Sequence, residues 1–375
     1  MQKYKTLSNG IIFAELDGTK GHYELGLQHG RLLREKILDC IHYVRSWYCE
    51  ELGQDGGEKL IHKLQYETAY LSDAKAFLPE IYDELRGIAD GCGIPVEEAF
   101  LINCLDEGFY LMLDQKQDKI PSGKCTCLGL KKTESLPCRM AQNLDFSTAY
   151  NGFQTLFKIH ESDRDILIYS FCGQLMGMGV NSKGISVIAN AIVNGTVSLE
   201  HGVSNTLMQR AFYECNNTDE CETLLRKCPR ATSTAYTVSD FNTIRCFEAT
   251  VNGVAEVQIP NNAPGIAHTN HLLVSQDTRN MDGACFGSKI LKTPDGVSWE
   301  MTEERLEIAR QFVAQNGNNA TEDMLMSFLT TPPILRNYGD PTIQSFVAII
   351  DRDNPCIYVA GGDDKREFVK VSLFS

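Results

Sequence analysis

The hydrophobic pattern of this chain changes its period once, at Cys125. Upstream of Cys125, apolar residues recur every three or four positions, which is typical of amphipathic helices. Downstream, they alternate in short runs bounded by turns, which is typical of strands. The segment Gly123–Leu130 stands at this junction, and Ala141–Phe146 follows it at about the distance of one hairpin. We therefore expect helices packed on sheets, with Cys125 near the start of the first strand of the second region.

The region before Cys125 is predicted to be mostly helical. Leu33, Ile37, Ile41, Val44 and Tyr48 fall on one face of a helix about four turns long. Two more helical segments are predicted: Phe77–Ile88, and one that begins at Pro95, since proline fits a first helical turn.

The region from Cys125 onward is predicted to form two antiparallel sheets, stacked together and covered by helices, in an α+β architecture. Helices are expected after Ser204, from Thr218 to Pro229, and around 303–314. The predicted strands are 139–141, 155–159, 166–169, 185–189, 235–238, 245–249, 254–257, 345–350 and 357–360.

Composition excludes several classes of partner. With 35 basic and 49 acidic residues, the net charge of −14 argues against nucleic acid and anionic membrane surfaces. No apolar run reaches the ~18 residues that span a bilayer. Fourteen cysteines without an N-terminal signal predict reduced thiols in a cytoplasmic protein, most of them small buried hydrophobes.

Cys125 has two interpretations from the residues alone: a buried strand cysteine, or a nucleophile. A free thiol is mostly protonated at neutral pH and needs a base. If the chain were cut before Cys125, the new α-amino group could be that base.

Polar residues elsewhere fit the second interpretation. Asp145 follows Cys125 by about one hairpin and could orient the new amino group. Asn270, in a polar turn between His268 and His271, offers an amide donor for an oxyanion. The two histidines could suggest a metal, but hydrogen bonding within a loop is the favoured interpretation.

Several ordered motifs run along nearly the whole chain: Gly26–Gly30 (Gly-x-x-His-Gly), Tyr82–Gly91 with Glu97–Asn103, Cys125-Thr126, Gln142–Phe146, Gly179–Ile185 and His268–His271. In order and spacing they resemble the isopenicillin N acyltransferase family of self-cleaving N-terminal nucleophile hydrolases. The resemblance implies the four-layer αββα sandwich of such hydrolases. Residues 1–124 would be the helical α chain and 125–375 the catalytic β chain of one compact domain.

The resemblance also implies roles for residues. Cys125 would be the nucleophile and carry the base, Asp145 would orient its amino group, and Asn270 would contact the oxyanion or substrate. Cleavage would fall between Lys124 and Cys125, although the family often has glycine where this chain has Lys124. Two further substrate-binding candidates are Asn190 and Arg336, the latter being the arginine nearest to the family's C-terminal one.

Three functions are weighed. The leading one is an amide hydrolase or acyltransferase that acts on a small acylated amine or amino-acid conjugate through a Cys125 thioester. It needs no cofactor or metal, its two chains stay associated, and homo-oligomerisation is left open. The acidic chain disfavours a strongly anionic acyl donor such as a coenzyme A ester. The alternatives are an uncleaved, non-catalytic small-molecule-binding protein on the same fold, and a thiol redox or zinc protein built on Cys125-x-Cys127.

Overall fold

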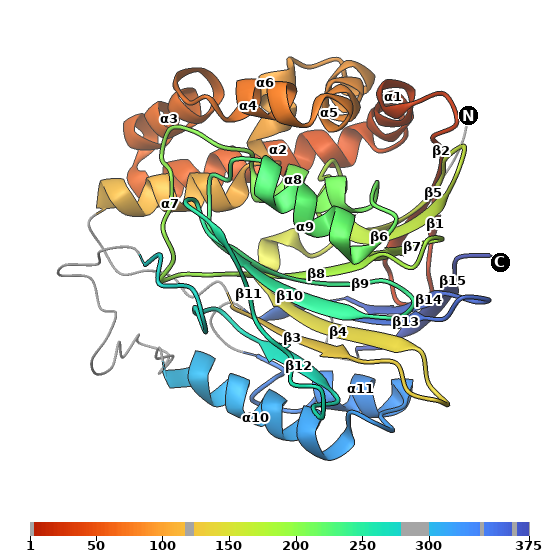
Figure 1. The fold of residues 1–375 in the computed structure, drawn as a ribbon. Coiled ribbons are helices and arrows are strands. Elements are labelled where there is room, and N and C mark those ends of the chain that lie inside the picture. Colours follow the sequence, from red (N-terminus) through yellow and green to blue (C-terminus); the bar gives the residue numbers. More distant parts are fainter. Residues whose placement is uncertain (1–3, 117–123, 279–299, 338–340, 362–365, 375) are drawn as a thin grey trace.

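Two stacked β-sheets lie between two layers of helices (Figure 1). The computed structural model describes residues 4–116, 124–278, 300–337, 341–361 and 366–374. The helices of the first third of the chain cover the outer face of one sheet, and two helices near the C-terminus cover the outer face of the other. The predicted α+β class and four-layer αββα arrangement are confirmed.

The sheet next to the N-terminal helices has nine strands, in the order β1-β2-β5-β6-β7-β8-β9-β10-β11. Its pairs are antiparallel except β2 and β5, which are parallel. Strand β2 comes from the region before Cys125, so that region contributes to the sheet as well as to its cover. The bounds are β1 (Lys5–Thr6), β2 (Ile12–Asp17), β5 (Gln154–His160), β6 (Asp165–Phe171), β7 (Met178–Asn181), β8 (Ser186–Ala191), β9 (Thr234–Ser239), β10 (Ile244–Ala249) and β11 (Val254–Glu256).

The other sheet has six strands, in the order β12-β3-β4-β13-β14-β15, and is antiparallel throughout. Strands β3 and β4 are consecutive in the sequence and form a hairpin. Strand β12, which lies far along the chain, pairs with the other edge of β3. The bounds are β3 (Lys124–Leu130), β4 (Cys138–Asp145), β12 (Gly265–His268), β13 (Thr342–Ile350), β14 (Cys356–Ala360) and β15 (Val369–Ser372).

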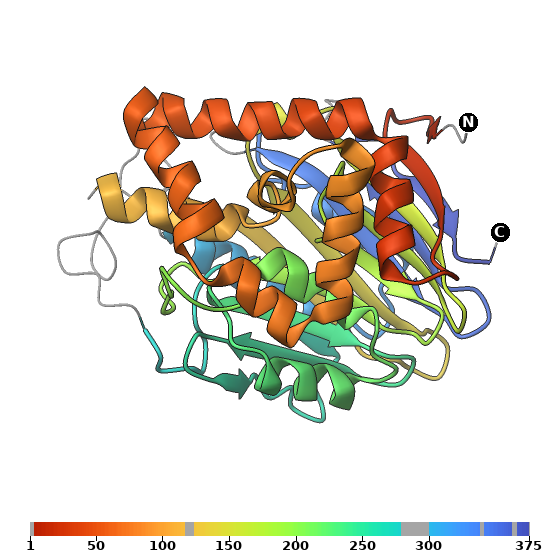
Figure 2. The same ribbon diagram turned by 90° about the horizontal axis from the view of Figure 1, so that it is seen from above.

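Helices fill the two outer layers, and Figure 2 shows the N-terminal ones spread over the nine-stranded sheet. The first group is α1 (His22–Leu32), α2 (Arg34–Leu52), α3 (Gln54–His62), a π-helical turn (Lys63–Glu67), α4 (Tyr70–Phe77), α5 (Pro79–Cys92), α6 (Val96–Leu101) and α7 (Leu105–Lys116). The rest are a 3₁₀ turn (Thr148–Tyr150), α8 (Asn205–Phe212), α9 (Thr218–Lys227), α10 (Glu300–Asn316) and α11 (Glu322–Leu329).

Most predicted elements are present, and the differences have local causes. The five apolar residues that predicted α2 are all buried. The single helix expected over Phe77–Ile88 is interrupted, because Pro79 begins a new helix and leaves Phe77 exposed. Asn217, not Thr218, is the N-cap of α9, since its side chain accepts a hydrogen bond from the amide of Glu220.

The Gly-x-x-His-Gly motif forms the crossing of α1 and α5. A Cβ on Gly26 would lie 1.9 Å from the carbonyl oxygen of Glu84, and one on Gly87 would lie 2.1 Å from that of Tyr23, so only glycine permits this approach. His29 accepts a hydrogen bond from the amide of Gly173 at 3.0 Å, and burial lowers its pKa to about 4. These residues position the helical layer on the sheet rather than perform chemistry.

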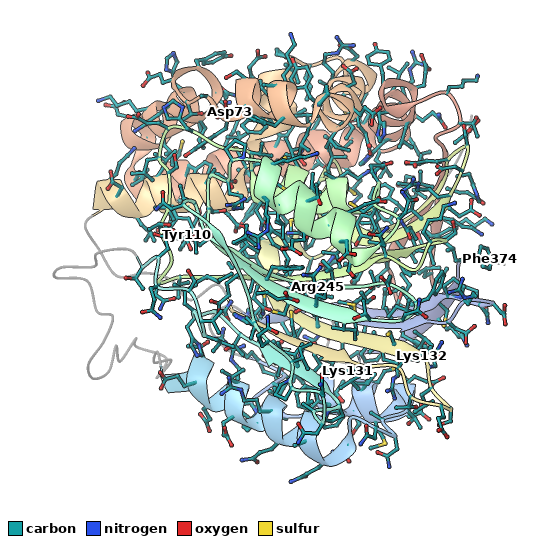
Figure 3. All side chains as sticks on the ribbon, viewed as in Figure 1. Asp73, Tyr110, Lys131, Lys132, Arg245 and Phe374 are labelled. Carbon is teal, nitrogen blue, oxygen red and sulfur yellow. The ribbon has the colours of Figure 1, made fainter. Side chains whose placement is uncertain are left out.

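The expectation that most cysteines are buried can be checked on the described residues. All of their cysteines are buried except Cys49, as predicted. Lys131 and Lys132 lie in the turn after β3 (Figure 3), where Lys131 donates to the carbonyl of Pro260, so the pair belongs to a surface turn. Among the described helices, none combines the length and apolar character needed to cross a bilayer.

Candidate active site

Cys125 is the second residue of β3, and the hairpin returns a carboxylate beside it. The register places Asp145, the last residue of β4, opposite Lys124. This is the arrangement expected from the hairpin spacing. Because side chains alternate along a strand, Cys125 faces the nine-stranded sheet.

Strand β12 brings Asn270 to the other side of Cys125. His268 pairs with Cys127, so continuing the antiparallel register two residues brings Asn270 level with Cys125. The amide N–H of Cys125 donates to Oδ1 of Asn270 at 3.0 Å, and Nδ2 of Asn270 donates to the carbonyl of Ala191 at 3.0 Å. The sequence predicts a polar turn at His268, but that residue ends a strand, and this places Asn270.

Arg305 of α10 fixes the same two residues from the opposite face of the sheet. Its guanidinium is fully buried, and Nη1 donates to the carbonyl of Cys125 at 2.8 Å and to Oγ1 of Thr126 at 2.7 Å. Nη2 donates to Oδ1 of Asn270 at 3.0 Å. Two donors therefore converge on this amide oxygen, which determines the orientation of the Asn270 side chain.

Asp145 is buried in a polar environment at the end of β4. Its Oδ1 accepts a hydrogen bond from the hydroxyl of Thr342 at 2.6 Å. Nη1 of Arg336 lies 4.0 Å from Oδ2, and Arg336 is itself fully buried. Arg336 is therefore placed as a buried counter-charge to Asp145, and it does not line the cavity described below.

The thiol of Cys125 is protonated in the intact chain. Burial raises its pKa to about 12, and the negative charge of Asp145 contributes to the rise. Arg305 and a hydrogen bond from Gln142 act in the opposite direction and are outweighed. A sulfur in this state needs either a proton acceptor or a nearby positive charge before it can attack a carbonyl.

The Cys125 side chain lines a cavity, which we call the nucleophile cavity. Its empty volume is about 720 Å³. Its wall is mostly apolar and lies between the sheets and helices α7 and α8. A few amide, hydroxyl and carboxyl groups interrupt this surface, as is usual in small-molecule sites. The lining residues used below are Leu105, Asp106, Gln142, Leu144, Phe146, Tyr150, Ala189, Ala191 and Asn205.

Gln142 joins the two sheets beside the thiol. Its Nε2 donates to the carbonyl of Ala189 at 2.6 Å, and its Oε1 accepts from the amide of the same residue at 3.1 Å. The side chain thus forms the paired bonds that a neighbouring strand would make. This contact fixes the distance between Cys125 and the wall formed by β8.

Asn190 occupies a different place from the one expected. Ala189 and Ala191 line the nucleophile cavity, and strand alternation turns Asn190 away from it, beside the thiol of Cys127. The hydrophobic run that predicted β8 locates the strand but not which of its faces meets the cavity.

His268 and His271 are held within the protein. The ring of His268 lies with Nδ1 2.8 Å from the carbonyl of Thr269 and Nε2 3.1 Å from Oε1 of Glu248. Nδ1 of His271 lies 3.2 Å from the hydroxyl of Thr302, and burial lowers the pKa of His271 to about 4. These contacts agree with the hydrogen-bonded interpretation of the motif.

Arg305 is the site residue that the sequence analysis missed. A weak signal was present, because Arg305 lies on the same stripe of α10 as Thr302, Leu306, Ala309 and Val313, all of which are buried. An arginine on an apolar stripe has to find buried partners. The sequence does not say which ones.

Comparison with known proteins adds the family. No curated protein sequence matches this chain. Among solved structures, penicillin V acylase from Agrobacterium tumefaciens is similar with a TM-score of 0.40 and 10% sequence identity, over 67% of this chain and 87% of that chain. Residues 132–352 match the family model for acyl-coenzyme A:6-aminopenicillanic acid acyl-transferase. This range holds Asp145, Asn270 and Arg305 but begins after Cys125, whose place in the site is given by the geometry. Because the match covers more than half of the sequence, the chain belongs to the acyl-coenzyme A:6-aminopenicillanic acid acyl-transferase family.

Proposed function

We propose that this protein is a self-cleaving cysteine amide hydrolase or acyltransferase that acts on small acylated amines, with Cys125 as its nucleophile. The observation that carries the proposal is the set of contacts around Cys125. Its nitrogen bonds to Asn270, its carbonyl bonds to Arg305, and its thiol faces a mostly apolar cavity. Both backbone groups of one strand residue are thus held by buried side chains.

Self-cleavage would begin at the bond between Lys124 and Cys125. Sγ attacks the carbonyl carbon of Lys124, the C–N bond breaks, and the nitrogen of Cys125 leaves as an amine that carries the thiol proton. Water then hydrolyses the thioester, releasing the carboxylate of Lys124 and the free thiol. The products are residues 1–124 and a chain that begins with Cys125.

Cleavage would also supply the missing base. The thiol of Cys125 has a pKa of about 12 in the intact chain, so it stays protonated at neutral pH. A free α-amino group has a pKa of roughly 7.7–8.0 and can take up the thiol proton. The nascent amine would stay in place because its nitrogen already bonds to Oδ1 of Asn270.

The neighbouring residues then acquire roles. Oδ1 of Asn270 would hold the amine, while one hydrogen of Nδ2 is used by the carbonyl of Ala191 on the cavity wall and the other is available to an oxyanion. Arg305 would act as a positioning residue, since it fixes Asn270 and the backbone of Cys125. Asp145 would supply the negative charge that stabilises the ammonium.

In turnover, the thiol would attack the substrate amide, and its proton would pass through the α-amine to the departing amine. The acyl group would remain on Sγ as a thioester until water or a second amine attacks it. The two chains would stay together after cleavage, because β2, from the first chain, pairs with β5 along its whole length.

The test compares the purified wild type with Cys125→Ala by intact mass and N-terminal sequencing. We expect two fragments near one third and two thirds of the mass from the wild type, the larger beginning at Cys125, and one intact chain from the variant. Cys127→Ala is the matched control, because Cys127 lies on the same face of β3 and is buried; it should still cleave. An intact wild type that binds small molecules without turning over any amide would support the non-catalytic alternative instead.

A further inference from the structure

A second cavity adjoins the nucleophile cavity. Its empty volume is about 1180 Å³, and we call it the aromatic cavity. Both cavities are lined by Leu105, Asp106, Phe146, Tyr150 and Ala191, so these residues form a shared wall. A molecule with its amide at Cys125 could therefore extend across this wall into the aromatic cavity.

Aromatic rings dominate the second cavity. Besides Phe146 and Tyr150, Tyr43 and Trp47 of α2 and Tyr110 of α7 line it. Figure 3 labels Tyr110 on the sheet-facing side of α7.

The rings are held in position. Phe146 and Tyr43 each pack edge-on against Tyr150, with centroids 5.0 and 5.6 Å away. The hydroxyl of Tyr43 lies 3.0 Å from that of Ser147, and the hydroxyl of Tyr110 donates to the carbonyl of Ile192 at 3.2 Å.

A carboxylate stands in the shared wall. Oδ2 of Asp106 accepts a hydrogen bond from Nδ2 of Asn205 at 2.6 Å, and its charge contributes to raising the pKa of Cys125. The adjacent Glu107 points into the core, where Oε1 accepts from the amide of Asn205 and the hydroxyl of Thr232. Burial raises the pKa of both carboxyl groups, that of Glu107 to about 8, and the negative charge of Asp106 adds to the rise at Glu107.

The described lining of both cavities contains no lysine, arginine or histidine. Ring faces attract cations through their quadrupole, and a carboxylate on the shared wall adds a direct charge. An anion in this cavity would be repelled by the ring faces and by the carboxylate. The net charge of −14 acts in the same direction over longer distances.

We propose that the aromatic cavity is a substrate subsite for a cationic group, a primary or alkylated ammonium, on the part of the substrate remote from the amide that Cys125 attacks. Asp106 and the rings of Tyr43, Trp47 and Tyr110 form the subsite. This inference rests on the proposed function for its substrate but not for its binding chemistry. It makes Asp106 a specificity-determining residue and predicts discrimination against anionic substrates.

The test uses a pair of probes of equal shape and different charge: choline and its uncharged isostere 3,3-dimethylbutan-1-ol. Binding is measured by calorimetry on the wild type and on Cys125→Ala, so catalysis plays no part. We expect choline to bind at least about 10-fold tighter than the isostere. Equal affinities, or no detectable choline binding, would overturn the subsite.

Three variants localise the effect. Asp106→Asn should weaken choline binding about 10-fold and leave the isostere unchanged. Trp47→Leu should weaken both probes, and it keeps the test available if Asp106→Asn fails to fold. Asp114→Asn is the matched control, since Asp114 is exposed on the same helix and the variant changes the net charge equally; both affinities should stay the same. A choline affinity that is unchanged in Asp106→Asn would contradict the proposal.

A turnover experiment separates this inference from the proposed function. Two amides are compared that differ only in a remote trimethylammonium or tert-butyl group. Preference for the cationic amide, lost in Asp106→Asn, supports both proposals. Turnover of both amides at equal rates removes the subsite and keeps the function. If neither amide is turned over while choline binding persists, the subsite stands and the function falls.

Discussion

Several arginines are fully buried in the described part of the chain, and two of them, Arg210 in α8 and Arg305 in α10, differ in what surrounds them. Arg210 ion-pairs with Glu84, Glu161 and Glu214, each within 3.0 Å, and His22 joins through Glu84 at 2.9 Å. We call this set the Arg210 cluster. It links helices α1, α5 and α8 to the turn between β5 and β6.

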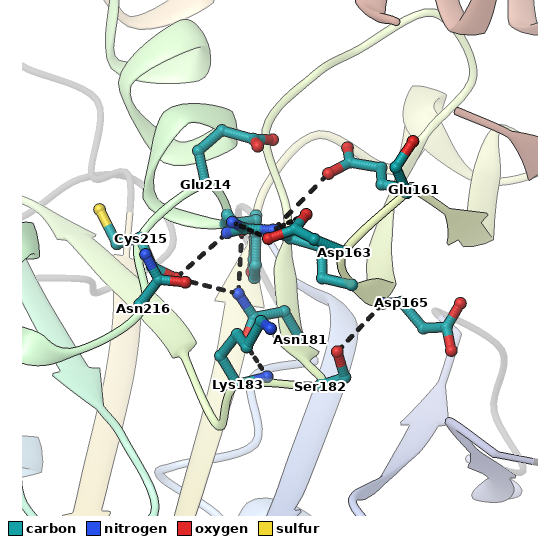
Figure 4. A network of polar contacts seen from close by, with 12 residues as sticks. Glu161, Asp163, Asp165, Asn181, Ser182, Lys183, Glu214, Cys215 and Asn216 are labelled. Atoms are coloured by element: carbon teal, nitrogen blue, oxygen red, sulfur yellow. Dashed lines mark hydrogen bonds and ion pairs between the residues drawn. The ribbon is translucent and has the colours of Figure 1, made fainter. Parts of the chain in front are cut away.

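Figure 4 shows the sheet-side edge of this cluster. Glu161 and Glu214 belong to both the cluster and the polar network in this view. In that network, Nδ2 of Asn181 donates to the carbonyl of Cys215 at 3.3 Å, and its Oδ1 accepts from the amide of Lys183 at 2.9 Å. Asn181 belongs to the Gly179–Ile185 motif singled out in the sequence. In this structure the motif forms a hydrogen-bonded turn.

The contacts of Arg305 include the carbonyl of Cys125, the hydroxyl of Thr126 and the amide oxygen of Asn270. We call these residues the Arg305 cluster. These contacts are with neutral groups beside the proposed nucleophile, whereas Arg210 ties helices together through carboxylates. A buried arginine alone therefore does not mark a functional site, and the groups that it contacts have to be compared as well.

The largest effect is expected from Arg210→Met, which leaves buried carboxylates without their cation. Breaking such a pair typically costs about 3–5 kcal/mol, so the free energy of unfolding in urea should fall by that amount. The specific activity of the folded fraction should stay near that of the wild type. Arg226→Met, at an exposed ion pair, is the control and should cost less than about 1 kcal/mol. A stable but inactive Arg210→Met protein would break the comparison.

Arg305→Met should give the reverse pattern. We expect activity to fall about 10²–10³-fold, which corresponds to roughly 2.7–4 kcal/mol of transition-state stabilisation. The unsatisfied oxygens should cost only about 1–3 kcal/mol of stability. Because Arg305 acts through Asn270 and Cys125, the loss should appear in kcat more than in KM.

Arg305→Lys, which restores the charge and part of the donors, should recover some of this activity. Arg310→Met on the exposed face of α10 should change little. If the Arg305→Met protein is less stable but keeps its turnover rate, Arg305 has a structural role like that of Arg210.

Asp145→Asn tests the negative charge beside the Arg305 cluster. A positioned acid–base group is commonly worth about 10²-fold, so turnover should fall by at least that factor. Asp145 raises the pKa of the Cys125 thiol, so in the uncleaved fraction of the two proteins its removal should shift alkylation of Cys125 to lower pH. Peptide mass spectrometry of iodoacetamide-treated protein follows this residue alone. Slower turnover with an unchanged alkylation profile would assign Asp145 a structural role only.

The smallest effect is a pH dependence in the Arg210 cluster. Burial acts to lower the pKa of His22, but the hydrogen bond and charge of Glu84 outweigh it, and the pKa is raised. A folded-state pKa above the unfolded value gives stabilisation that is fully present below about pH 6.5 and is lost as the pH rises through the folded-state pKa.

His22→Gln should therefore lower the free energy of unfolding in urea by about 1 kcal/mol at pH 5.5 and change it little at pH 9. His42→Gln, at an exposed position on α2, controls for the loss of a histidine. An equal loss at both pH values would show that His22 contributes packing rather than charge.

The sequence by itself determined the features that depend on near neighbours. The change of period at Cys125 located the switch from helices to strands, because apolar spacing reports which face of an element is buried. The short separation between Cys125 and Asp145 predicted a hairpin, and the register places the carboxylate opposite Lys124. The family resemblance rested on such local motifs and is confirmed by the family match.

Tertiary structure decided which distant elements meet at Cys125. Asn270 is 145 residues from Cys125 in the sequence, and it reaches Cys125 because β12 pairs with β3. Arg305 reaches Cys125 because α10 packs against the same end of these strands. The same packing turned Asn190 out of the cavity and placed Arg336 beside Asp145. The periodicity of a strand indicates that one of its faces is buried. Which strand it pairs with depends on contacts summed over both sheets, and no local sequence pattern contains that information.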